Sequence, residues 1–251
     1  MKAGRNMKEV RSVKITTIVD NDVWRKELLS SWGLSFLVET VSEEKRYGVL
    51  MDTSGSFEAL SKNASCLNVN FSSIEAIFVS HWHADHCGSL SHVLPLSQRP
   101  IPVYVPSASF SEIRTIKEAQ GIPLVCSRPI EFTDGLMSTG EMPAGISEHS
   151  LLINLKNKGL IVLVGCSHPG IINILKCAQK ISGIDKIYAV IGGFHISSLG
   201  EGMRVGEFLR ALDVRLVSPC HCTSKEAKQG IAKTLGERYI KNGSGKTISL
   251  G

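Results

Sequence analysis

Short apolar runs bounded by polar residues dominate the first half of the chain and predict β-strands. Such runs occupy residues 13–19, 34–40, 47–51, 74–79, 100–105 and 122–126. Residues 56–64 and 109–119 predict helices between them. The run at 74–79 is almost wholly apolar, which is typical of a strand that is buried on both faces.

The second half shows the same order of strands and helices. Residues 149–155 and 160–164 predict two strands joined by the turn at 156–159, a hairpin signal. Further helices are predicted at 170–181, 202–212 and 224–235, and further strands at 186–191, 214–218 and around Ile248. Strands with interleaved helices, twice over, favour two sheets between two helical layers over one doubly wound sheet. No G-x-G-x-x-G motif follows the first strand, which argues against a dinucleotide-binding fold.

Nothing in the sequence divides it, because no repeat, low-complexity tract or long linker interrupts its 251 residues. We therefore expect a single domain over residues 1–251, with a flexible segment at 1–11. The 43% hydrophobic and 20% charged residues are typical of a soluble, well-packed protein. The charged start has no apolar run behind it, and no apolar run approaches the length of a membrane span. These features predict a soluble, cytoplasmic protein without a membrane partner, and a homo-oligomer is compatible with them.

The charge and the cysteines narrow the classes of partner. A formal net charge of +5 suits a small anionic substrate. No dense Lys/Arg block or basic face interleaved with aromatic residues is present, so we expect no nucleic-acid partner. The seven cysteines are odd in number and scattered, unlike those of a disulfide scaffold. Reduced thiols in a cytoplasmic protein are therefore expected.

The strongest chemical signal is the stretch HWHADH at residues 81–86, directly after a predicted strand. In an extended segment, side chains two positions apart project to the same side. His81 and His83 can therefore bind one ion, while Asp85 and His86 point toward a neighbouring position. Imidazole and carboxylate suit zinc, iron or manganese. Histidines that merely cap a loop are the plain alternative, and this density of ligand types argues against it.

Residues 79–90, VSHWHADHCGSL, resemble the signature loop of the metallo-β-lactamase superfamily. The resemblance implies an α/β (α+β) protein with a four-layer αββα sandwich, in agreement with the predicted order of elements. It also implies that the first two histidines hold one metal ion and the Asp-His pair a second. In that superfamily an earlier Asp-x-Gly turn supports the site, and residues 51–55, MDTSG, look like that turn.

Two later histidines stand where the remaining ligands of such a centre would be needed. His168 in GCSHPG and His221 in PCHCT each follow a predicted strand. Ordinary loop roles for both stay open. The resemblance implies two divalent ions, with zinc as the first expectation and manganese or iron as alternatives. The expected ligands are His81, His83 and His168 for the first ion, and Asp85, His86 and His221 for the second.

One residue departs from the superfamily pattern. Many members carry a bridging aspartate after the strand that here ends before Gly165, whereas this chain has Cys166 and no acidic residue in that turn. Three consequences stay open: the thiolate is a ligand, water alone forms the bridge, or the second ion is held weakly. The thiol can also be a small buried side chain that only fills space. A structural zinc site made of cysteines is rejected, because it would need a Cys-x-x-Cys-like grouping.

Phrases spread over residues 13–250 narrow the resemblance to one branch of the superfamily. They are VDN, GLSFLVE, VGCSHPGIINI, YAVIGGFH and PCHCT. Together they resemble the 7,8-dihydropterin-6-ylmethyl-4-(β-D-ribofuranosyl)aminobenzene 5′-phosphate synthases. The resemblance implies a metal-dependent transferase of methanopterin-type biosynthesis. Such an enzyme joins a dihydropterin-methyl diphosphate to a ribofuranosylaminobenzene phosphate with loss of diphosphate, so a small pterin or phosphate-type substrate is expected.

Catalytic roles are expected for Asp85, as a ligand rather than a base, and for His195. The latter, in the phrase IGGFH, can donate to a phosphate or move a proton near neutral pH; a loop histidine without such a role is the alternative. His92 and His149 are expected not to bind metal. A dinuclear metallohydrolase acting on a phosphodiester or another small ester or lactone is the rival function. A non-catalytic pterin or nucleotide sensor is a third, against which the six candidate ligands argue.

Overall fold

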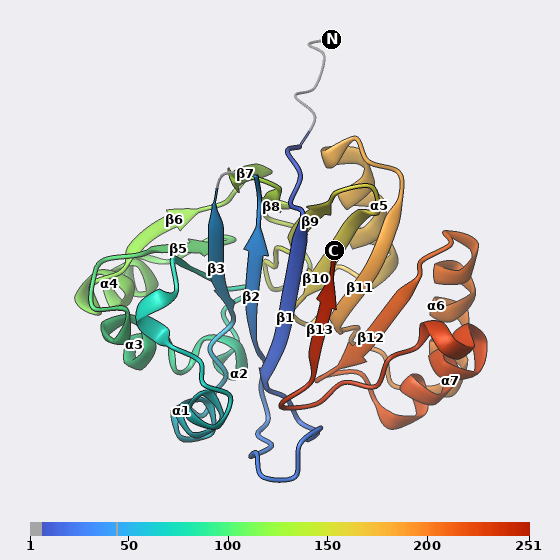
Figure 1. Cartoon of the computed structure of the whole chain (residues 1–251), viewed down its shortest axis with the longest axis horizontal. Helices are drawn as coiled ribbons and strands as arrows, with labels where there is room; N and C mark the ends of the chain where they lie inside the picture. Colours follow the sequence, from blue (N-terminus) through green and yellow to red (C-terminus); the bar gives the residue numbers. More distant parts are fainter. Residues whose placement is uncertain (1–6, 44) are drawn as a thin grey trace.

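Two β-sheets lie face to face in the computed structural model, which describes residues 7–43 and 45–251 (Figure 1). One layer of helices covers the outer face of each sheet. A third set of apolar side chains fills the space between the sheets. The predicted four-layer αββα sandwich is therefore confirmed.

The first sheet combines antiparallel and parallel strands in the order β13-β1-β2-β3-β4-β5-β6. The pairs from β13 to β3 are antiparallel, and those from β3 to β6 are parallel. Its strands are β1 (Ser12–Val19), β2 (Ser35–Val41), β3 (Arg46–Met51), β4 (Ala76–Phe78), β5 (Pro102–Val105), β6 (Ile122–Val125) and β13 (Thr247–Leu250).

The second sheet has the order β12-β11-β10-β9-β8-β7. The predicted hairpin forms β9 and β10, which pair antiparallel, whereas β10, β11 and β12 run parallel. Its strands are β7 (Ile130–Thr133), β8 (Leu136–Ser138), β9 (Leu151–Leu155), β10 (Gly159–Val164), β11 (Ile187–Gly193) and β12 (Leu216–Cys220).

Strand β10 shows why its sequence is apolar throughout. Ile161 and Leu163 point into the core between the sheets. Leu160 and Val162 alternate with them and point toward the outer helices. Both faces of the strand are therefore removed from water, so neither set of alternate positions can be polar.

The helices divide between the two outer faces, as Figure 1 shows. Apolar residues of α1, α3 and α4 pack on the first sheet, and those of α5, α6 and α7 pack on the second. Among the described residues, no helix has the length and apolar character that crossing a membrane requires. The helices are α1 (Phe57–Cys66), α2 (Ala84–Cys87), α3 (Leu90–Val93), α4 (Phe110–Glu118), α5 (Ile171–Ser182), α6 (Leu199–Ala211) and α7 (Lys225–Leu235), with short 3₁₀ turns at Phe71–Ser73, Leu94–Ser97 and Gly236–Arg238.

The predicted strands and longer helices are all present. Their boundaries differ from the prediction by two residues or fewer, except at the start of α6, and one hairpin was not predicted. β4 is shorter than the run at 74–79 that predicted it. Helix α6 begins three residues earlier than predicted, because Ser198 and Glu201 form a capping box ahead of it. The β7–β8 hairpin was not predicted, because its strands have only four and three residues and no residue of β7 is buried.

A flexible segment was expected at residues 1–11, of which positions 1–6 lie outside the described residues. Residues 7–11 differ from that expectation. Met7 and Val10 are buried, and the amide of Val10 donates to the carbonyl of Asn154 at 2.9 Å. Their apolar side chains thus fill space beside β9 and β10, and this burial orders the segment.

Candidate metal centre

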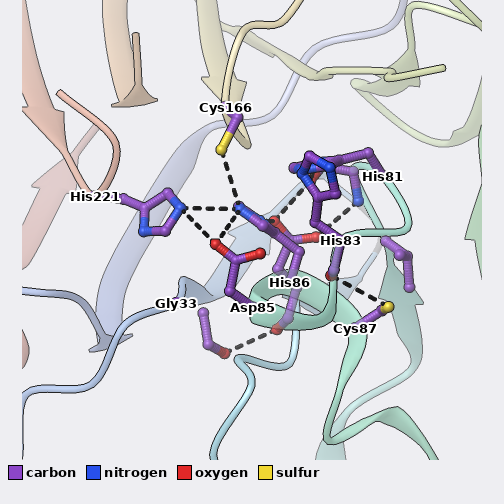
Figure 2. A network of polar contacts seen from close by, with 12 residues as sticks. Gly33, His81, His83, Asp85, His86, Cys87, Cys166 and His221 are labelled. Carbon is purple, nitrogen blue, oxygen red and sulfur yellow. Dashed lines mark hydrogen bonds and ion pairs between the residues drawn. The ribbon is translucent and has the colours of Figure 1, made fainter. Parts of the chain in front are cut away.

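The candidate donors lie just after the ends of strands from both sheets. Residues 81–86 follow β4 of the first sheet, whereas Cys166 and His168 follow β10 and His221 follows β12 of the second. Because β10, β11 and β12 run parallel, their carboxyl ends meet at one edge of the sheet. The fold brings all of these segments together there (Figure 2).

His81, His83 and His168 form what we call the first group. One ring nitrogen of each lies within 4.8 Å of the others. His81 Nε2 lies 3.1 Å from His83 Nδ1, and the ring centroids of His81 and His168 are 4.7 Å apart. Three nitrogen atoms at these separations can surround a single metal ion.

Asp85, His86 and His221 form the second group, whose donor atoms also lie within 4.8 Å of one another. Figure 2 shows the three side chains pointing toward a common position. His221 Nε2 is 3.1 Å from His86 Nε2 and 3.2 Å from Asp85 Oδ2. The structure therefore assembles the two sets of residues that the sequence suggested, each as a compact group.

Four of the five histidines are fixed by a hydrogen bond at the ring nitrogen that faces away from the centre. A ring that donates outward through Nδ1 presents the lone pair of Nε2 to the centre. Ser80, which contacts His81, in turn donates to Asp52 in the turn expected to support the site. The contacts are His81 to Ser80 Oγ at 2.9 Å, His86 to Asp52 Oδ2 at 2.6 Å, His168 to Glu148 Oε2 at 2.8 Å and His221 to Asn21 Oδ1 at 3.1 Å.

Three of the candidate donors favour the protonation states that a divalent ion requires. Burial and the neighbouring His86 lower the pKa of His81 to about 2, and burial and His221 lower the pKa of His86 to about 3. Burial opposes ionisation of Asp85, but contact with His221 and His86 holds its pKa below the ordinary value. Neutral imidazoles and an ionised carboxylate are the forms that bind metal. His86 Nε2 and His221 Nε2 lie 3.1 Å apart, so both nitrogens can face a single cation.

Glu148 is the orienting residue that the sequence did not reveal. Its fully buried carboxylate accepts hydrogen bonds from the backbone amides of Cys166, Ser167 and His168 and from His168 Nδ1, at 2.8–3.0 Å. Burial alone would raise the pKa of Glu148, but these hydrogen bonds, led by that of the His168 ring, outweigh it and bring the pKa to about 2. Glu148 therefore stays ionised and fixes both the turn after β10 and the ring of His168. The only signal in the sequence was an acidic residue directly before an apolar strand.

His149 and His92, which were expected not to bind metal, lie outside both groups. The ring of His149 is fully buried, with Nε2 donating to the Val79 carbonyl at 2.8 Å and Nδ1 accepting from Ser138 Oγ at 2.8 Å. Both of its ring nitrogens are therefore occupied by the protein. His92 stacks on the ring of Phe57 instead.

Cys166 lies between the two groups. Its Sγ is 3.2 Å from His86 Nε2 (Figure 2). It also lies within 4.8 Å of donor atoms from His81, His168 and His221, in separate combinations. A sulfur atom is thus present between the groups, in the turn where the sequence comparison with the superfamily suggested a bridging aspartate.

His195 lies at the rim of the centre, beside the first group. Its ring is 4.8 Å from that of His168, and its side chain is exposed. Its backbone has φ of 49°, as has that of His221. Five of the ten described non-glycine residues with positive φ belong to loops of the centre: Asp52, Ser54, Ser167, His195 and His221. Such strain persists only where surrounding contacts enforce the conformation, which is common at functional sites.

Trp32 is a second feature that the sequence did not single out. Its ring lies 5.3 Å from the ring of His221, yet the residue is 67% exposed. The loop that carries it is tied down on both sides, because the amide of Gly33 donates to Asn21 Oδ1 and that of Leu34 donates to the carbonyl of Asp85. A large aromatic face is therefore held against the second group but left open to solvent.

Comparison with known proteins relates this centre to enzymes. No family model matches the chain. A 7,8-dihydropterin-6-methyl-4-(β-D-ribofuranosyl)-aminobenzene-5′-phosphate synthase of Methanocaldococcus jannaschii is 30% identical to it, over 98% of the chain and 99% of that protein. An uncharacterised protein of the same organism is 23% identical, over 94% of the chain and 100% of its own length.

Solved structures agree with this fold. Tm1679, described as a metal-dependent hydrolase of the β-lactamase superfamily, has a TM-score of 0.76 and 24% identity, covering 94% of the chain and 98% of that structure. The metallo-β-lactamase fold protein YhfI from Bacillus subtilis has a TM-score of 0.69 and 14% identity, covering 96% of the chain and 100% of its own. The structural likeness shows the fold, and the full-length sequence match shows the family. The chain is an enzyme that belongs to the family of the 7,8-dihydropterin-6-methyl-4-(β-D-ribofuranosyl)-aminobenzene-5′-phosphate synthase, within the metallo-β-lactamase superfamily.

Proposed function

We propose that the protein is a transferase that joins a dihydropterin-methyl diphosphate to a ribofuranosylaminobenzene phosphate and releases diphosphate. One observation carries the proposal. The chain aligns over 98% of its length with a relative named for this product, and the same chain gathers both groups of candidate metal donors at one edge of its sheets. A match of fold alone would not distinguish a transferase from a hydrolase.

The residues would hold two divalent ions, one in each group. We assign the first ion to His81, His83 and His168, and the second to Asp85, His86 and His221. Zinc is the first expectation, and manganese or iron suits the same nitrogen and oxygen donors. Two such cations, when bound, neutralise the charge that develops on a diphosphate leaving group and orient it for displacement. The outward hydrogen bonds of the histidines keep the donor atoms aimed at the ions.

The reaction forms one bond and breaks another. The amine nitrogen of the aminobenzene bonds to the methyl carbon of the pterin, the bond from that carbon to the diphosphate oxygen breaks, and the nitrogen loses a proton. His195 is exposed at the rim beside His168, and we assign to it the role of accepting that proton or of donating to a phosphate oxygen. Asp85 acts as a ligand, because its Oδ2 faces His221 Nε2 at 3.2 Å.

A pocket of about 410 Å³ adjoins His168 and His195. Its walls include the apolar side chains of Ile171, Phe194 and Val205, with a few polar groups among them. Such a composition is typical of small-molecule sites, in which apolar walls hold a ring and polar groups orient it. We assign the dihydropterin ring to this pocket, which would place its methyl group beside the first group of donors.

The proposal is tested by supplying metal-loaded protein with both substrates and measuring the coupled product and diphosphate. We expect equal amounts of the two, and almost no diphosphate when the arylamine is left out. The matched variants H221Q and H92Q remove one histidine inside the centre and one outside it, and only the first should abolish product formation. Diphosphate release that does not depend on the arylamine, or cleavage of a phosphodiester without product formation, would instead establish a metallohydrolase.

A further inference from the structure

A second pocket, of about 520 Å³, adjoins the centre on the side of His221. We call it the lysine pocket, and its walls include Asn21, His221, Lys225, Lys228, Tyr239 and Lys241. His221 contributes both to this pocket and to the second group, so the pocket lies next to the centre. A volume of this size accommodates part of a small molecule rather than a chain of a macromolecule.

The charges in this pocket do not cancel. Lys225, Lys228 and Lys241 contribute three positive charges, whereas Asp22 contributes the only carboxylate among the described lining residues. Lys228 Nζ pairs with Asp22 Oδ2 at 2.9 Å. Neither Lys225 nor Lys241 forms an ion pair with another described residue, so the pocket keeps a net charge of about +2.

Helix α7 arranges part of this charge. Lys225, Lys228 and Ala232 lie at intervals of three and four residues, which places them on one face of the helix. Ala232 has a short side chain, which leaves room between the lysines and the wall formed by Tyr239 and Lys241. The first turn of the helix adds the positive end of its dipole beside Lys225.

We infer that the lysine pocket binds the phosphate monoester of a small substrate. On the proposed function, on which this assignment rests, that group is the 5′-phosphate of the ribofuranosylaminobenzene. The diphosphate of the other substrate must lie at the metal donors, where the bond to it breaks. The 5′-phosphate is separated from the reacting amine by the benzene and ribose rings, so it needs a second cationic site beside the centre and not within it. The lysine pocket lies in that position.

Lysine is suited to this task because its ammonium group acts as a mobile point charge that follows a phosphate without a fixed bidentate geometry. Because Lys225 and Lys241 are exposed, their contribution should fall as salt is added. A site made in this way gives modest affinity for the phosphate alone and selects substrates that also fit the metal centre.

The test uses ribose 5-phosphate as the probe and metal-loaded protein. Its dissociation constant is measured by titration calorimetry for the wild type, for the double variant Lys225→Ala with Lys241→Ala, and for Lys233→Ala, which removes a lysine of α7 that does not line the pocket. We expect the double variant to bind ribose 5-phosphate about tenfold more weakly, as two solvent-accessible charge contacts would allow. Lys233→Ala should change the constant less than twofold, and unphosphorylated ribose should not bind measurably.

Inorganic diphosphate serves as a second probe, because it should bind at the metal ions and keep its affinity in the double variant. Equal binding of ribose 5-phosphate by the wild type and the double variant would overturn the assignment and place the monoester at the metal ions. If the transferase assay gives no product but the double variant still binds ribose 5-phosphate more weakly, the proposed reaction is rejected and the phosphate site stands. The two results are therefore distinguishable.

Discussion

Glu148 offers the sharpest test of how this centre is held together. Its two carboxylate oxygens accept four hydrogen bonds from the turn Cys166–His168, three from backbone amides and one from the ring of His168. Replacing it with glutamine keeps the size of the side chain but converts one oxygen into an NH₂ group. That group then faces two donors, so two of the four hydrogen bonds are lost whichever way the amide is turned.

The expected loss follows from these contacts. A hydrogen bond to a charged group contributes roughly 1.5–3 kcal/mol, and two are removed. Part of the loss is offset, because a neutral amide is less costly to bury than a carboxylate. We expect Glu148→Gln to lower the free energy of unfolding by about 3 kcal/mol. Because either the His168 ring or the turn that carries it loses its partners, metal affinity of the first group should fall roughly 10–100-fold.

The assay measures both quantities on the same samples. Urea denaturation of metal-free protein gives the free energy of unfolding, and competition with a chromogenic chelator gives the metal affinity. The control is Glu141→Gln, since Glu141 lies in the segment before β9 and contacts Ser147 instead of the turn after β10. The reasoning is refuted if Glu148→Gln matches the wild type within about 0.5 kcal/mol and retains full metal affinity.

Three further predictions concern other residues near or outside the centre. Because Trp32 presents an open ring beside His221, a bound planar substrate should quench its fluorescence. Trp32→Phe should abolish this quenching and raise KM about tenfold. The control Trp24→Phe should leave both the quenching and KM unchanged. Because Cys166 Sγ lies between the two groups, 3.2 Å from His86 Nε2, we expect it to add a thiolate to the assigned donors. Cobalt-loaded wild type should then show a near-ultraviolet charge-transfer band that Cys166→Ser lacks. Burial lowers the pKa of His149 to about 3. Below about pH 6.5 the imidazole is therefore protonated in the unfolded chain but not in the folded one. The free energy of unfolding then falls by roughly 1.4 kcal/mol per pH unit, until about pH 3. The loss of stability between pH 7 and 5 should therefore be about 2 kcal/mol smaller in His149→Gln than in the wild type, and unchanged in a His92→Gln control.

The sequence was most informative where local pattern and tertiary environment agree. The strand β10 is buried on both faces, so its apolar run was unambiguous. The stretch 81–86 carries its ligand types at adjacent positions, and His168 and His221 follow strands whose carboxyl ends meet. The β7–β8 hairpin escaped prediction because its strands have four and three residues, too few to establish a pattern.

The residues that orient the donors were harder to predict, for a physical reason. Glu148 acts on a turn some twenty positions later in the chain, and only the pairing of β9 with β10 brings the two together. Asn21 contacts a histidine two hundred positions away. A carboxylate or amide in such a role resembles any other polar residue beside a strand, because its partner is supplied by the fold and not by a neighbouring position.

The arrangement of the two groups couples the centre to the sandwich itself. In each group, donors from the loop after β4 belong to the first sheet, and one histidine from a loop after β10 or β12 belongs to the second. An ion in either group would therefore connect the two sheets at one edge, in addition to the apolar side chains packed between them. Without ions, that edge holds ring nitrogens facing one another at 3.1 Å, whereas the interior between the sheets stays apolar. Metal binding should thus stabilise the strand ends around the centre more than the opposite edge of the sheets, because an ion that binds only the folded centre adds its binding free energy there.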